Sequence, residues 1–164
     1  MTTYYPLTVG NCWTYTMKDG SNYTNAVTGV DGNIFTMKTS NLDRPQLVRK
    51  DGDAYWADNY EAGNFQLILK DGLKVGDSWE IKYKANTIDN ILTMTVKEVG
   101  VTKQVNGHSY PNVAVVEGDL KMNVAGNLMP ANYQVQHYYA DGVGLVLTTT
   151  SYGDTIPLTA CELK

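Results

Sequence analysis

The residue types that most often carry catalysis or bind metals are sparse in this chain. Its two histidines, His108 and His137, have no cysteine near them and no second histidine at a short spacing. A zinc site needs three or four such ligands, so we expect both histidines to be structural or solvated. Nothing in the sequence points to a metal ion or to any other cofactor.

Short motifs for calcium, nucleotide or nucleophile sites are incomplete. Asp51-Gly52-Asp53 begins like a calcium loop but lacks the later glycine and glutamate. Gly142-Val143-Gly144 lacks the third glycine of a dinucleotide fingerprint, and no Gly-x-Ser-x-Gly elbow occurs. We therefore expect a protein that is not an enzyme. A hydrolase with two acids facing a cleft stays open as the weakest alternative, because sequence does not give the separation of carboxylates.

Two cysteines, Cys12 and Cys161, lie almost at opposite ends of the chain. If the first and last strands pair, a disulfide between them would close a loop of about 150 residues, worth about 4–5 kcal/mol in the chain-entropy model. The alternative is two unrelated reduced side chains, since a bridge requires Cα atoms within about 7 Å. The sequence leaves both possibilities open.

Composition limits the class of protein and its partners. A chain of 164 residues suits a single domain, 1–164. The net charge is −4 and the 13 basic residues are scattered, whereas nucleic-acid phosphates demand a concentrated basic surface. No apolar run approaches the roughly 20 residues of a transmembrane helix. We expect a monomer without a transmembrane segment that does not bind nucleic acid.

The segments between turn signals alternate between apolar and polar residues. In 79–84, Trp79, Ile81 and Tyr83 share one face and polar residues share the other, which is typical of a strand with one solvated side. The turn signals are Asp-Gly and Asn-Gly pairs, which tolerate the backbone angles of tight hairpins. They stand at 19–20, 31–32, 51–52, 71–72, 106–107 and 141–142.

No window of eleven or more residues shows a convincing helical period. The pattern predicts an all-β domain, a meander of about eleven or twelve antiparallel strands. It would form a single strongly curved sheet or half-open β-barrel with little or no helix. The expected strands, one or two of them irregular, lie near 12–18, 22–30, 33–40, 45–50, 53–57, 65–70, 78–85, 88–100, 111–118, 120–125, 133–139, 144–151 and 155–163.

One motif occurs twice: Leu-x-Val-Gly-[Asn/Asp]-x-Trp stands at 7–13 and again at 73–79. We interpret it as a strand entry, in which the glycine permits a turn or bulge and the tryptophan anchors the strand inside. The two copies could also mark an internal duplication. Because the segments between them do not otherwise align, a repeated local device is the simpler interpretation.

A third segment, YYADGVGLV at 138–146, completes a set. With PLTVGNCWTY at 6–15 and GLKVGDSW at 72–79, it resembles a group of poorly characterised bacterial secreted proteins and lipoproteins with the motifs PLxVGxxWxY, GDxW and YYAxGVGLV. The resemblance spans most of the chain and implies a half-barrel similar to outer-membrane lipoprotein carriers. It implies a cell-envelope location (periplasm or outer membrane, with or without a lipid anchor) or secretion, and no catalytic residues.

The first ten residues, MTTYYPLTVG, have neither the basic nor the apolar region of a signal peptide. Yet the chain is rich in tyrosine, threonine and asparagine and poor in charge, a composition that we associate with proteins outside the cytoplasm. We therefore expect this to be a mature form from which a leader has been removed.

We expect the protein to bind an apolar or amphipathic small molecule, such as a lipid, in the concave face of the sheet. The alternative is a carbohydrate- or protein-interaction module that uses exposed aromatic residues, since neighbours on a strand such as Tyr55 and Trp56 point to opposite faces. That module would use Tyr55, Trp56, Tyr60 and Tyr138. The inward residues predicted to line the lipid site are Trp13, Tyr15, Met17, Trp79, Ile81, Tyr83, Leu92 and Met94.

Overall fold

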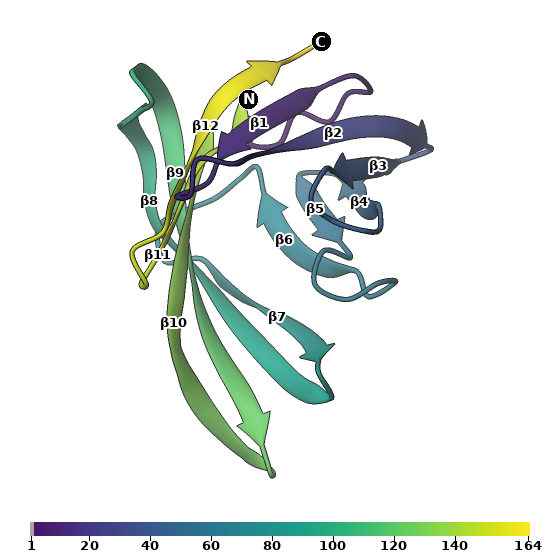
Figure 1. Ribbon diagram of the computed structural model, residues 1–164, viewed down its shortest axis with the longest axis vertical. Coiled ribbons are helices and arrows are strands. Elements are labelled where there is room, and N and C mark those ends of the chain that lie inside the picture. Colours follow the sequence, from purple (N-terminus) through teal and green to yellow (C-terminus); the bar gives the residue numbers. More distant parts are fainter. Residues whose placement is uncertain (1) are drawn as a thin grey trace.

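The computed structural model describes residues 2–164 and contains twelve β-strands (Figure 1). No helix in this range is long and apolar enough to cross a membrane. The strands are β1 (Cys12–Thr16), β2 (Asn22–Asp31), β3 (Ile34–Thr39), β4 (Gln46–Asp51), β5 (Ala54–Ala57), β6 (Gln66–Lys70), β7 (Ser78–Ala85), β8 (Ile88–Val105), β9 (His108–Val124), β10 (Asn127–Ala140), β11 (Gly144–Thr150) and β12 (Thr155–Glu162).

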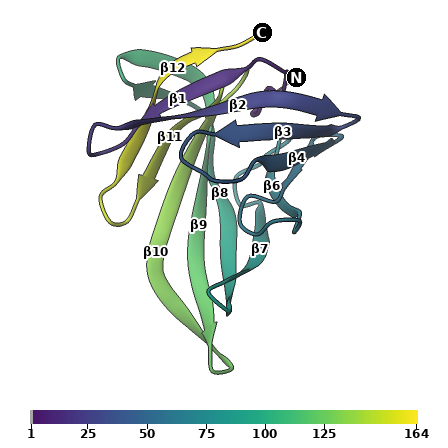
Figure 2. The same cartoon turned by 45° about the vertical axis from the view of Figure 1, so that its right-hand side comes forward.

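All twelve strands belong to one antiparallel sheet, in the order β6-β5-β4-β3-β2-β1-β12-β11-β10-β9-β8-β7. The two terminal strands, β1 and β12, pair with each other. Over residues 2–164, the sheet therefore curls into a nearly closed barrel whose one unpaired junction lies between β6 and β7 (Figures 1 and 2). The predicted all-β class and half-open barrel are confirmed.

The first copy of the repeated motif forms a tight turn that leads into β1. Gly10 has φ 100° and donates its N–H to the Val27 carbonyl on β2 at 2.9 Å. Asn11 donates its N–H to the Thr8 carbonyl at 3.0 Å, which closes the turn. The positive φ explains why a glycine stands at this position.

The second copy forms the same turn before β7. Gly76 has φ 94° and donates to the Val96 carbonyl on β8 at 2.9 Å, while Asp77 donates to the Lys74 carbonyl at 3.0 Å. The strand-entry interpretation is therefore correct. The two copies open two six-strand halves, β1–β6 and β7–β12, which meet at two junctions.

β8, β9 and β10 are longer than predicted and extend past the rest of the barrel (Figure 2). The sequence predicted a break near Gly118, between 111–118 and 120–125, but β9 runs through it. A Cβ at Gly118 would lie 3.0–3.1 Å from Met94, Leu92 and Val135 side chains. The glycine marks a close approach inside a strand rather than a turn.

The N-terminal segment covers one end of the barrel. Thr3 donates its N–H to Asp141 Oδ1 at 2.8 Å, and Tyr4 donates its N–H to Asp71 Oδ1 at 3.0 Å. These acids lie in the β10–β11 and β6–β7 connections, so the segment ties both halves together. In an antiparallel meander, the β3–β4 and β5–β6 connections lie at the opposite end.

Candidate functional site

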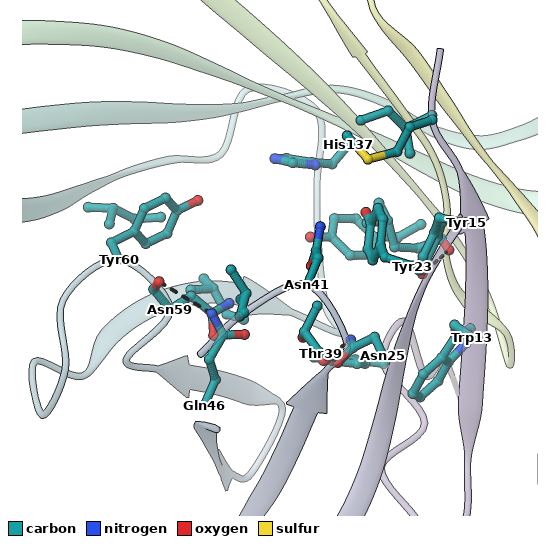
Figure 3. A pocket seen from close by; sticks show the side chains of 18 of the residues that line it. Trp13, Tyr15, Tyr23, Asn25, Thr39, Asn41, Gln46, Asn59, Tyr60 and His137 are labelled. Carbon is teal, nitrogen blue, oxygen red and sulfur yellow. Dashed lines mark hydrogen bonds between the residues drawn. The ribbon is translucent and has the colours of Figure 1, made fainter. Parts of the chain in front are cut away.

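The barrel interior holds a cavity of about 390 Å³. Residues of both halves line it, from β1–β4, β6–β8 and β10–β12, together with the β3–β4 and β5–β6 loops (Figure 3). Asn41, Leu42 and Asn59 in these loops are exposed, whereas Trp13 and Ile81 are buried. The mouth therefore lies at the loop end, and the floor lies toward the N-terminal segment.

The floor is aromatic and held in place. Trp13 donates its indole N–H to the Val143 carbonyl at 2.7 Å, and Tyr15 donates its hydroxyl to the Leu145 carbonyl at 2.8 Å. Tyr15 also stacks on Tyr23 with ring centroids 5.2 Å apart. Because the polar atoms of Trp13 and Tyr15 are engaged by carbonyls of the β10–β11 connection and of β11, these two rings present mainly apolar surface to the cavity.

Five of the eight residues predicted to line a ligand site do line this cavity: Trp13, Tyr15, Met17, Ile81 and Met94. The other three lie elsewhere in the barrel. Leu92 is packed in the core. Trp79 is half-buried, and its indole nitrogen has no hydrogen-bond partner among the described residues. Tyr83 packs on Tyr60 with ring centroids 5.0 Å apart. Ligand contact by any of the eight stays a prediction.

The mouth and the polar groups of the cavity were not predicted. Asn41, Gln46 and Asn59 come from loops or strand ends whose placement depends on long-range pairing. His137 was expected to be solvated or structural, and Tyr60 was assigned to the outer surface. Figure 3 shows His137 and Tyr60 on different walls of the cavity, with Asn41 on a third side, below His137 in this view. The only sequence signal was the polar character of these connections.

All of the residues that line the cavity are uncharged at neutral pH. Burial lowers the pKa of His137 to about 4, so its imidazole is neutral there. Its Nδ1 lies 3.4 Å from Thr148 Oγ1. Burial raises the pKa of Tyr5 and of Tyr60 to about 12, and it raises the pKa of Tyr139 as well. The cavity offers neutral hydrogen-bonding groups on an apolar background.

The unpaired junction between β6 and β7, which we call the seam, borders the cavity through Ile68 and Ile81. Side chains there replace strand pairing. The backbone carbonyl of Lys82 accepts a hydrogen bond from Asn64 Nδ2 at 3.1 Å, and its backbone N–H donates to Gln66 Oε1 at 3.0 Å.

The same network continues along β7. Lys84 donates its N–H to Glu61 Oε1 at 3.0 Å, and Asn64 donates to the same oxygen at 3.1 Å. The free edge of β7 is thus capped by side chains. Tyr60, which belongs to the same β5–β6 loop as Glu61 and Asn64, packs on Tyr83 and lines the cavity.

An apolar lip extends from the mouth along the β9–β10 hairpin. Met122 pairs with Met129 across the hairpin and with Asn90 on β8, which in turn pairs with Tyr83. Directly paired residues share a face of the sheet, so the two methionines, which define the lip, continue the inner face. Met129 is 49% exposed.

The aromatic residues proposed for an outer platform are mostly not available. Tyr55 is fully buried and donates its hydroxyl to Asp71 at 2.8 Å, and Tyr60 faces the cavity. Trp56 is half-buried, and the guanidinium carbon of Arg49 lies over its ring, 5.6 Å from the ring centroid. Tyr138 is half-buried beside Lys103. The prediction of four exposed aromatics is wrong because tertiary packing covers them.

Two acids lie in a shallow polar depression on the outer face of β8–β11. Glu117 Oε2 accepts from Gln136 at 3.1 Å, and Asp119 Oδ1 accepts from Gln134 at 2.8 Å. Both carboxylates are therefore engaged by glutamines on an open surface, which is typical of the solvated face of a sheet.

The disulfide considered from the sequence is not formed, and Cys12 and Cys161 are free. Their strands do pair, but Cys161 is opposite Trp13 while Cys12 is opposite Glu162. Paired residues share a face and neighbours alternate. Cys161 therefore lies on the inner side with Trp13, and Cys12 lies on the outer side.

The sequence of this chain matches no protein-family model and no curated protein. Two solved structures share its fold. One is a predicted exported protein with a YmcC-like fold from Bacteroides fragilis, with a TM-score of 0.62, 10% identity, and coverage of 99% of this chain and 100% of that one. The other is a predicted lipoprotein from Parabacteroides distasonis, with a TM-score of 0.65, 12% identity, and coverage of 98% and 99%.

Proposed function

We propose that this protein is a non-catalytic protein of the cell envelope, or a secreted protein, that holds an apolar or amphipathic, lipid-like molecule inside its barrel. The observation that carries the proposal is the interior cavity of about 390 Å³. Small-molecule sites usually measure about 300–1,000 Å³ and combine apolar walls with a few polar groups.

Two further features support this proposal. The apolar lip of Met122 and Met129 continues the inner face beyond the mouth, and it offers apolar surface along which a chain could enter. The location outside the cytoplasm is supported by the two structural neighbours, described as an exported protein and a lipoprotein, and by the composition of the chain.

An NMR titration of the ¹⁵N-labelled protein tests the proposal. The ligands are single-chain amphiphiles with neutral, anionic and cationic heads, and soluble oligosaccharides serve as the comparison. We expect at least one amphiphile to shift the resonances of cavity residues, while the oligosaccharides shift none of them. If no amphiphile perturbs the cavity at millimolar concentration, the proposal is wrong.

A matched pair of variants assigns the binding to the cavity. Ile156 lines the cavity on β12, and its neighbour Thr155 is exposed on the other face. Ile156→Trp should fill the cavity and weaken binding at least tenfold, whereas Thr155→Trp should leave it unchanged. Equal affinities of the two variants would place the ligand outside the barrel.

A further inference from the structure

We infer that the ligand of this cavity is an electrically neutral amphiphile: one apolar chain or compact ring system with an uncharged hydrogen-bonding head such as a hydroxyl, ester or amide. This inference rests on the proposed function and narrows it from lipid-like molecules in general. It excludes free fatty acid anions and cationic amphiphiles as preferred ligands.

The first support is the absence of a counter-charge. Among residues 2–164, those that line the cavity include no aspartate, glutamate, lysine or arginine. Moving a carboxylate or an ammonium group from water into such a site without an opposite charge is costly. A neutral head does not incur this cost.

The second support is that the titratable groups of the cavity are neutral. His137 contacts Thr148 on β11 and lies 6.1 Å from the Tyr139 ring, while its pairing partner on β9 is Val116. No acid faces it from these elements, so nothing there would hold an imidazolium. A cation that could bind a fatty acid carboxylate is therefore not present.

The third support is a set of polar groups without protein partners. Within the described chain, the Asn41 amide, the Tyr60 hydroxyl and His137 Nε2 have no hydrogen-bond partner, and Figure 3 shows all three side chains at the cavity. Together they offer donors and acceptors but no charge. The floor formed by Trp13 and Tyr15 has its polar atoms engaged. The head therefore lies near Asn41, and the tail lies on the floor.

The size of the cavity favours a small ligand. A volume of about 390 Å³ is near the lower end of the range for small-molecule sites, about 300–1,000 Å³. One medium-length chain or a compact ring system suits this space better than a phospholipid with two chains.

A panel with one tail and different heads tests the inference: 1-decanol, monodecanoyl glycerol, decanoate and decyltrimethylammonium at pH 7.5. Decanol is kept below its solubility limit and each of the others below the concentration at which it self-associates. We expect the two neutral ligands to bind at least tenfold more tightly than the two ions by NMR titration. If decanoate binds in the cavity as tightly as decanol, the charge inference fails while the proposed function stands. If none of the four perturbs the cavity, both fail.

A charge introduced at the mouth sharpens the test. Asn41→Lys places a cation at the proposed position of the head, and Thr28→Lys adds the same charge at an exposed site on β2 that does not line the cavity. We expect Asn41→Lys to raise the affinity for decanoate at least tenfold and Thr28→Lys to change it less than twofold. An unchanged decanoate affinity in Asn41→Lys would contradict the placement of the head.

Discussion

β12 and β1 meet through four register pairs, whereas β6 and β7, the equivalent last and first strands of the two halves, have no ladder between them. The same motif leads into β1 and into β7, so strand entry does not decide whether a junction closes. What differs between the two junctions is the segment that lies beside the entering strand. Before β7, the β5–β6 loop supplies Glu61 and Asn64, and the first residue of β6 is Gln66. The side chains of these three residues occupy hydrogen-bonding groups on the free edge of β7.

We expect this difference to separate a more stable side of the barrel from one that opens more readily. Backbone ladders with buried side chains exchange slowly, while edges held by exposed side chains open at low free-energy cost. The seam borders the cavity through Ile68 and Ile81. The closed junction therefore fixes the floor, and the seam is the side of the barrel where the cavity wall is least constrained.

The largest effect on the free energy of unfolding is expected from replacing the tryptophans of the two motif copies. Trp13→Ala should lower the free energy of unfolding by about 4 kcal/mol, because a fully buried ring and its hydrogen bond to Val143 in the β10–β11 connection are lost. Trp79→Ala should cost about 2 kcal/mol, since Trp79 is half-buried and its indole nitrogen has no partner. Urea unfolding measures both. Equal losses of unfolding free energy in the two variants would contradict the expected difference between the two tryptophans.

The next effect concerns pH and the barrel interior. Because burial lowers the pKa of His137 from 6.5 to about 4, the unfolded state binds a proton more readily than the folded state. The free energy of unfolding should thus be unaffected above pH 6.5 and fall by up to about 3 kcal/mol as the pH drops to 4.

Variants isolate this contribution between pH 6.5 and 4.5, above the range in which most carboxylates titrate. His137→Gln should flatten the loss of stability, whereas His108→Gln, at the exposed first residue of β9, should keep the wild-type slope. If both variants keep that slope, the imidazole of His137 is not held neutral by the fold.

The smallest effect in free energy is at the seam. Glu61→Ala should change global stability by less than about 1 kcal/mol, because Glu61 is half-buried and its hydrogen bonds lie at the surface. Amide exchange of Lys84 should nevertheless accelerate at least tenfold, since its N–H loses its acceptor. Glu61→Gln keeps a carbonyl oxygen and should exchange almost as slowly as wild type. If Lys84 is unprotected already in the wild type, the side-chain cap does not exist in solution.

Local features and the half-open barrel could be predicted from the sequence, whereas the strands that meet at its two junctions could not. The two strand entries depend on Gly10 and Gly76, whose backbone requirement is visible in a few residues. The pairing of β1 with β12 and the open seam depend on contacts between distant segments. The break predicted between strands 111–118 and 120–125 was wrong, since the reason for a glycine at 118, close packing under Met94, involves another strand.

In the candidate site, too, residues on regular strands could be predicted from the sequence, whereas residues placed by distant contacts could not. Alternation placed Tyr15, Ile81 and Met94 on the inner face, and they line the cavity. The side chains of Tyr138 and Tyr139 could not be assigned to a face, because both are large aromatics at adjacent positions and alternation alone does not say which one faces inward. In the structure, Tyr139 lines the cavity together with His137, two residues before it. The polar groups from the loops, Asn41 and Tyr60, have no periodicity from which to place them.

The central claim is that the barrel interior receives the tail of an amphiphile. The most direct measurement is the set of intermolecular nuclear Overhauser effects between monodecanoyl glycerol and methyl-labelled protein. We predict contacts from the chain to the methyl groups of Ile81, Met94 and Leu145, which line the cavity. Contacts only to exposed methyl groups such as those of Leu128, or no contacts at saturating ligand, would contradict the account.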